Sequence, residues 1–173
     1  MRRLVLLLCL SACATPKHEN RVSIDPEFVS LVQEFKTHGG VEIVDLVVEF
    51  GEPASLGCTH SDSTALVGCC RYRDGHTPTI AIDKDKWSAL DVQDLHLGQE
   101  YLGTSKRLLL FHELGHCVLK RSHLETIHAR GIPASIMMGQ TTSGYLPQLF
   151  YDYNAEYIEE LFGRGIGPTP FGQ

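Results

Sequence analysis

The apolar positions in the first half of the chain predict one helix followed by strands. Between Asp25 and Gly40 the apolar residues recur at helical spacing: Phe28, Leu31, Val32 and Phe35. Asp25-Pro26-Glu27 supplies an N-cap, a proline at the first helical position and a first-turn acid, and the glycines at 39 and 40 end the helix. Segments rich in β-branched residues then predict strands at residues 43–50, 64–73 and 78–83, with Asp74-Gly75 as a hairpin turn between the last two.

The second half of the chain is mainly helical and contains the most apolar helix. Residues 104–119 are apolar nearly all round, which is typical of a helix in the middle of a domain. Before it, residues 84–98 predict an irregular segment with one short helix near Trp87. After it, residues 131–147 predict a loop, and residues 153–162 predict a last helix that ends at Gly163. The expected fold is α+β: a single domain with a small twisted sheet packed on a central helix, and a C-terminal helix.

The N-terminal segment predicts export and anchoring. Two arginines precede an apolar run, Leu4 to Leu10, that is too short to span a membrane as a folded helix. Leu10-Ser11-Ala12-Cys13 resembles the bacterial lipobox, in which small residues precede a cysteine that is lipidated before cleavage. We therefore expect a signal peptide at residues 1–12, a lipidated tether at 13–23 and a folded domain at 24–173. The alternative is an ordinary signal peptide with a chance cysteine.

The expected location is the bacterial cell envelope, with the membrane contacted through the N-terminal lipid. The residues after Cys13 lack the aspartate that retains enteric-type lipoproteins at the inner membrane, which favours the outer membrane, facing the periplasm. Without Arg2 and Arg3, 13 of the 15 Lys and Arg remain against 21 Asp and Glu, a net charge of −8. Such a surface repels phosphate backbones, so nucleic acid is excluded as a partner.

The segment His112-Glu113-Leu114-Gly115-His116 within the central helix predicts a metal site. The two histidines are four residues apart, so both imidazoles leave one face of a helix. Glu113 is offset round the helix, where it can reach a metal-bound water without coordinating the metal, and act as general base. The alternative is a buried helix whose histidines are satisfied by hydrogen bonds in the core, but burying these groups without partners is costly.

The motif resembles that of the zincin metallopeptidases and, among them, the metzincins, whose helix is followed by a glycine turn and a third histidine. The resemblance implies one Zn²⁺ per chain, held by His112, His116 and His123. His123 comes one residue later than in the family pattern, and Lys120 stands where the family has glycine. His128, or Glu156 as in the other zincin branch, are the alternative third ligands.

A second segment carries the same resemblance. Residues 133–137, Pro-Ala-Ser-Ile-Met, look like the metzincin Met-turn, which places a methionine, here Met137, beneath the zinc. The alternative is that Ile136, Met137 and Met138 are simple core residues. Metzincins often use a tyrosine near this turn as an oxyanion stabiliser, and Tyr145 is the nearest candidate here. The whole chain is also similar to small bacterial lipoproteins classed as metallopeptidases, which share the His-Glu-Leu-Gly-His-Cys helix and a Tyr-x-x-Glu-Leu-Phe-like tail.

The function that the resemblance implies is a zinc metalloendopeptidase acting on polypeptides through a water activated by zinc and Glu113. Two alternatives remain open. One is a non-catalytic zinc-binding lipoprotein of the envelope, although a purely structural site has no need of Glu113. The other is a zinc amidase acting on the cell wall, since the same chemistry attacks amides generally.

The four cysteines of the folded domain are candidates for disulfides, because an exported protein folds where disulfides persist. A bond between adjacent Cys69 and Cys70 would be strained. Along the strand, Cys70 shares the more apolar face and Cys69 the opposite one, so Cys70 is better placed to meet Cys117 on the buried helix. Cys69 is then left for Cys58. The alternative is that Cys70 and Cys117 stay buried as free thiols.

Overall fold

The structure is a computed structural model that describes residues 20–58, 66–128, 131–139, 146–165 and 167–168. Cys13 and Tyr145, for which we predict lipidation and oxyanion stabilisation, lie outside the described residues. Within them the fold is α+β, with a mixed four-stranded sheet. No helix in these ranges is both long and apolar enough to cross a membrane.

The sheet has the strand order β1-β2-β4-β3. Its strands are β1 (Val22–Ile24), β2 (Leu46–Phe50), β3 (Gly68–Arg71) and β4 (Thr79–Ile82). β2 runs parallel to both β1 and β4, whereas β3 pairs antiparallel with β4 at the edge of the sheet. Gly75 has a positive φ of 75°, and the His76 N–H donates to the Arg73 carbonyl over 3.1 Å, which closes the predicted hairpin turn.

β1 was not predicted, and it changes the boundary of the tether. Val22 and Ser23, which we assigned to the tether, pair with Leu46 and Val47 of β2. The strand has only three residues and is mostly at the surface, so it carries too few apolar positions to be recognised from the sequence.

The helix predicted between Asp25 and Gly40 is confirmed, with a 3-10 turn at its start. It comprises η1 (Pro26–Phe28) and α1 (Val29–Gly39). The Asp25 carboxylate accepts from the Glu27 N–H over 3.0 Å, and Gly40 takes a left-handed conformation with φ 60°. Both ends of the helix are therefore set by the residues that predicted them.

The prediction of an irregular segment before the central helix was wrong. α2 (Lys84–Leu97) is a regular helix, capped by Asp83, which accepts from the N–H groups of Asp85 and Lys86. Its buried positions are Trp87, Leu90 and Asp94. Because one of these three residues is an aspartate, the helical spacing of apolar residues is hard to recognise in the sequence. The short helices η2 (Pro53–Leu56), η3 (Gln99–Tyr101) and α4 (Leu146–Asp152) were not predicted either.

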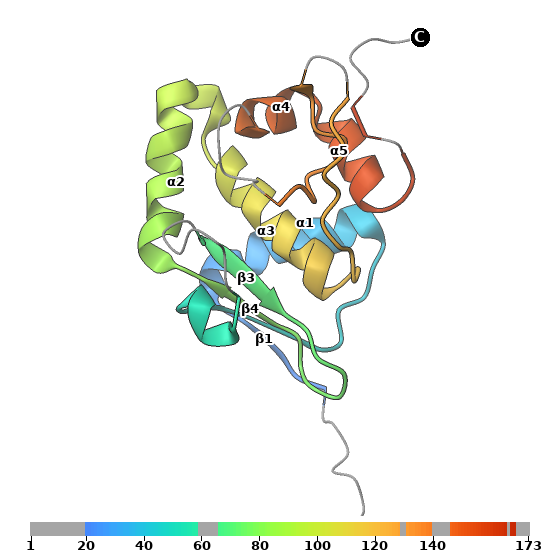
Figure 1. The fold of residues 1–173 in the computed structure, drawn as a ribbon. Coiled ribbons are helices and arrows are strands. Elements are labelled where there is room, and N and C mark those ends of the chain that lie inside the picture. The colour runs from blue at the N-terminus through green and yellow to red at the C-terminus, as the bar shows by residue number, and fades with distance from the viewer. Residues whose placement is uncertain (1–19, 59–65, 129–130, 140–145, 166, 169–173) are drawn as a thin grey trace, which may run out of the picture.

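α3 (Thr104–Cys117) is the central helix of the domain, as expected. It packs against β3, β4, α1, α2 and α4, and Figure 1 shows it between the sheet and the C-terminal helices. The fully buried Asp94 of α2 accepts from the Ser105 N–H over 3.1 Å and so satisfies a free donor at the start of α3. The last helix, α5 (Asn154–Leu161), lies within the predicted range.

Two disulfides connect the elements around β3, with the pairing expected from the sequence. Cys58 is bonded to Cys69, and Cys70 is bonded to Cys117 of α3, with 5.7 Å between the Cα atoms of the second pair. Cys70 does face α3, as expected, but Cys69, which we placed on the less apolar face of the strand, is the more buried of the two, with 3% of its surface exposed.

Candidate metal centre

Three histidines meet at one side of α3. His112 and His116 come from the helix itself, and His123 comes from the segment that follows it. The Nε2 atoms of His112 and His116 are 3.0 Å apart, and one nitrogen from each of the three rings lies within 4.8 Å of the others. Within the described ranges this is the one group of three or more His, Cys, Asp or Glu side chains that could hold a metal ion.

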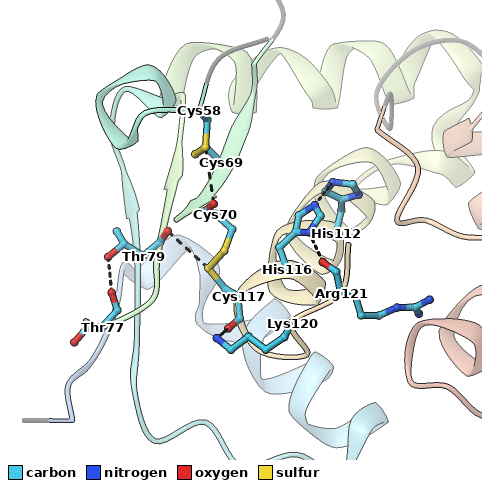
Figure 2. Close-up of a disulfide and its surroundings, with 10 residues drawn as sticks. All are labelled: Cys58, Cys69, Cys70, Thr77, Thr79, His112, His116, Cys117, Lys120 and Arg121. Atoms are coloured by element: carbon cyan, nitrogen blue, oxygen red, sulfur yellow. Dashed lines mark hydrogen bonds between the residues drawn. A yellow bond between two sulfur atoms is a disulfide. The ribbon is translucent and has the colours of Figure 1, made fainter. Parts of the chain in front are cut away.

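Hydrogen bonds at the far side of two rings fix which nitrogen faces the centre. His112 Nδ1 lies 2.7 Å from the Ile136 carbonyl oxygen. His116 Nδ1 lies 2.6 Å from the Arg121 carbonyl oxygen, a contact drawn in Figure 2. A carbonyl oxygen only accepts, so each Nδ1 carries a proton and donates it. In the neutral ring the lone pair is therefore on Nε2, and the two Nε2 atoms face each other.

This arrangement of lone pairs fits a cation. Burial lowers the pKa of His112 to about 3 and also lowers the pKa of His116, so both rings are neutral at pH 7. Two unprotonated nitrogens 3.0 Å apart repel each other, and a metal ion between them turns this repulsion into attraction. A ring nitrogen held by a backbone carbonyl on its other side is the usual outer support of a metal-binding histidine.

The chain reverses after α3 to bring His123 to the other two rings. Lys120 has a left-handed conformation with φ 58°, and the Arg121 N–H donates to the Gly115 carbonyl over 3.0 Å. We expected a lysine to adopt such a turn less readily than glycine, and the structure nevertheless has the turn there. A left-handed residue other than glycine costs about 1–3 kcal/mol, so the surrounding contacts must outweigh this strain.

The alternative third ligands are not part of the cluster. The His128 Nε2 is buried and has no hydrogen-bond partner among the described residues, and Glu156 is exposed on α5. His112 is buried, His116 is half-buried and His123 is exposed, so the cluster opens to solvent on the His123 side.

Met137 packs against α3, the helix that carries His112 and His116. It is fully buried, and a Cβ at Gly115 would collide with its sulfur and lie 3.1 Å from its Cε. The Met137 carbonyl accepts from the Leu124 N–H over 2.8 Å, next to His123. Ile136 thus supports His112 through its carbonyl, and Met137 supports His123 through the neighbouring Leu124. Ile136 and Met137 also belong to the hydrophobic core.

Glu113 is beside the cluster but not part of it. The residue is 6% exposed, and its carboxyl group lies against β3, since a Cβ at Gly68 would be 3.1 Å from its Oε1. Burial raises the pKa of Glu113 to about 8, and the nearby backbone N–H of Cys70 opposes that rise. A buried carboxyl group thus lies one residue from His112, a candidate metal ligand, on the neighbouring face of the helix.

Gly68 is a site residue that the sequence reasoning missed. A Cβ at this position would be 3.1 Å from both Cγ and Oε1 of Glu113, and 2.9 Å from the Ile82 Cδ1. A side chain at this position would have to displace the side chains of Glu113 and Ile82, so the glycine favours this close approach of β3 to Glu113. The available signal was a glycine inside a predicted strand, which often marks a close approach.

Arg121 was also missed, and it links the cluster to α5. Its carbonyl holds His116, while its guanidinium donates to the carbonyl oxygens of Glu160 and Leu161 over 2.7 and 2.9 Å. The guanidinium also pairs with the buried Glu160 carboxylate. These contacts fix the backbone of Arg121, and hence the carbonyl that orients the His116 ring.

We predict that removing this link weakens metal binding. Arg121→Ala combined with Glu160→Gln, which avoids leaving a buried charge unpaired, should lower metal affinity by about 10–100-fold, the usual effect of losing an outer support. Arg164→Ala is the matched control, because Arg164 pairs with Glu159 on the same helix but does not touch the cluster. Metal affinity is measured by competition with a chelator. A loss of thermal stability without a change in affinity would reduce Arg121 to a structural role.

The Tyr157 hydroxyl is not available as a hydrogen-bond donor to an oxyanion. The Tyr157 hydroxyl is engaged, because it donates to the Pro133 carbonyl over 3.0 Å, and the whole residue is buried.

No family model, curated protein or solved structure matches the chain. The inference of a metal site therefore rests on the geometry of the chain's own residues.

Proposed function

We propose that the protein is a zinc-dependent metallopeptidase with a zincin-like, metzincin-like domain. The observation that carries this proposal is the pair of Nδ1–carbonyl hydrogen bonds, which direct the Nε2 atoms of His112 and His116 toward each other, with Glu113 next to His112 in the same helix. Three imidazoles and no further protein ligand are typical of a catalytic zinc site, which keeps one position open.

The three histidines and Glu113 would have separate roles in hydrolysis. His112, His116 and His123 would hold the metal, and a bound zinc ion would supply Lewis-acid polarisation of the scissile carbonyl and lower the pKa of a water. Glu113 would take the proton of the attacking water and later give it to the leaving amine. Tyr145 remains our candidate for stabilising the oxyanion, on sequence grounds alone.

The edge of the sheet supports a polypeptide as the substrate. β3 pairs with β4 on one side only, and no other described strand lies on its outer edge. An extended peptide can add to such an edge through main-chain hydrogen bonds. Because Gly68 of β3 lies against Glu113, a peptide paired at this edge would run close to the general base.

The test is hydrolysis of an unfolded protein and of purified cell wall, each with and without a chelator. The proposal expects chelator-sensitive cleavage of the unfolded protein and none of the cell wall. Cleavage of the cell wall alone would identify an amidase. Zinc binding without either activity would identify a non-catalytic envelope lipoprotein.

We also propose that the protein is lipid-anchored in the bacterial cell envelope. Two disulfides are in keeping with folding in an oxidising compartment. Cys13→Ser should release soluble protein or block maturation, whereas Cys9→Ser, in the predicted signal peptide, should change little. Fractionation of cells and mass determination of the mature chain test this. An unmodified, untethered wild-type chain would contradict the anchor.

A further inference from the structure

One residue of β3 meets two successive turns of α3. Glu113 and Cys117 are four residues apart, so they project from the same face of the helix. The sulfur of Cys70 is bonded to that of Cys117, and Gly68 of the same strand lies against the Glu113 carboxylate, where a Cβ would be 3.1 Å from its Oε1. The backbone N–H of Cys70 is near enough to this carboxylate to lower its pKa. Figure 2 shows the disulfide on one side of α3 and the imidazoles of His112 and His116 on another.

We infer that Cys70 is a positioning residue for Glu113, and that the Cys70–Cys117 disulfide fixes this position, so that hydrolysis depends on the bond. This inference rests on the proposed function. Its physical basis is that a general base must be held in one orientation, within hydrogen-bond reach of the proton it takes.

The disulfide matters because it is the covalent link between β3 and α3. β3 has four residues and lies at the edge of the sheet, with backbone pairing to β4 alone among the described strands. Gly68 places no side chain between the strand and Glu113. The bond between Cys70 and Cys117 is therefore the covalent link that keeps the Cys70 N–H against the carboxylate. When the link is absent, strand and helix can separate, and Glu113 loses its fixed partner.

The metal ligands do not depend on this link in the same way. The His112 and His116 rings are held by the carbonyls of Ile136 and Arg121, which belong to segments other than β3. Loss of the disulfide should therefore reduce turnover while the metal stays bound. In a reducing compartment the chain would have the histidine cluster without a fixed Glu113, and its activity would appear on oxidation.

Formation of the bond requires a disulfide as the oxidant. The Cys70 thiolate attacks one sulfur of glutathione disulfide, forming a mixed disulfide and releasing one glutathione thiolate. The Cys117 thiolate then attacks the Cys70 sulfur, which forms the protein disulfide and releases the second glutathione. Two protein thiols thus lose two electrons and two protons, and one glutathione disulfide becomes two glutathione thiols.

The other disulfide supplies a matched control. Cys58–Cys69 attaches the same strand to the segment after η2 and does not involve α3. Replacing this pair removes one cross-link from β3 and leaves the contact with Glu113 in place.

The experiment compares two double variants with the wild-type protein. C70S/C117S should lose about 10–100-fold in kcat, as for other outer supports, with KM and a zinc content of about one per chain nearly unchanged. C58S/C69S should stay within about twofold of wild type, and titrating it with glutathione and its disulfide should make hydrolysis follow the Cys70–Cys117 bond. An unchanged kcat in C70S/C117S, or equal losses in both variants, would overturn the inference.

Amide hydrogen exchange provides a readout that needs neither hydrolysis nor the loss of a disulfide. In Glu113→Ala the Cys70 amide should exchange at least about tenfold faster, while the amides of Cys69 and Arg71 stay as in wild type. This measurement decides the matter if C70S/C117S does not fold, and unchanged exchange at Cys70 would overturn the inference. If the wild-type protein hydrolyses nothing, the proposed function fails, whereas the exchange result still tests the contact between Cys70 and Glu113.

Discussion

Glu113→Gln should lower kcat/KM for an unfolded protein substrate by about 10²–10⁴-fold, the usual contribution of a general base. The amide has nearly the size of the carboxylate but cannot take a proton. Because Glu113 lies outside the ligand cluster, the variant should keep about one zinc per chain. The measurement combines steady-state kinetics with metal analysis of the same preparation.

The matched control for this variant is Glu156→Gln, at an exposed position on α5. It makes the same chemical change away from the cluster and should leave kcat/KM and zinc content at wild-type values. If Glu113→Gln retained wild-type turnover, Glu113 would not be the base and the mechanism proposed here would be wrong.

His123→Ala should reduce zinc affinity by more than about 100-fold, beyond the range found for outer supports, because it removes a direct ligand. Two ligands from one helix remain in this variant, so residual binding through His112 and His116 is expected. Affinity is measured by competition with a chromophoric chelator, and folding is checked by thermal unfolding.

The alternative third ligands supply the controls for this second prediction. His128→Ala and Glu156→Ala should leave zinc affinity nearly unchanged, because neither residue belongs to the cluster. Equal losses in all three variants would indicate general destabilisation. A loss confined to Glu156→Ala would move the protein to the zincin branch that takes a glutamate from a later helix.

The elements that could be predicted are those whose signal lies in consecutive residues of the sequence. The start of η1 follows from Asp25 and the end of α1 from Gly40, and α3 follows from its nearly continuous apolar residues. The histidine pair was predictable because a spacing of four within a helix fixes a shared face whatever the rest of the chain does.

The features that the sequence did not predict are those that depend on tertiary contacts. α2 has an aspartate on its inner face because Asp94 binds the start of α3, and the sequence around it contains no sign of that partner. The roles of Gly68 and Arg121 likewise depend on residues 45 and 39 positions away, Glu113 and Glu160. Lys120 shows the reverse: local preference disfavours its left-handed turn, but the contacts that follow hold it there.

The most direct test of the metal centre, on which the proposed function depends, is the zinc content of the mature domain purified without chelators, followed through removal and return of the metal. We predict about one zinc per chain, loss of peptide hydrolysis when a chelator removes it, and recovery when one equivalent of zinc is added back. A folded domain that contains no zinc, and binds none at micromolar concentration, would contradict the account.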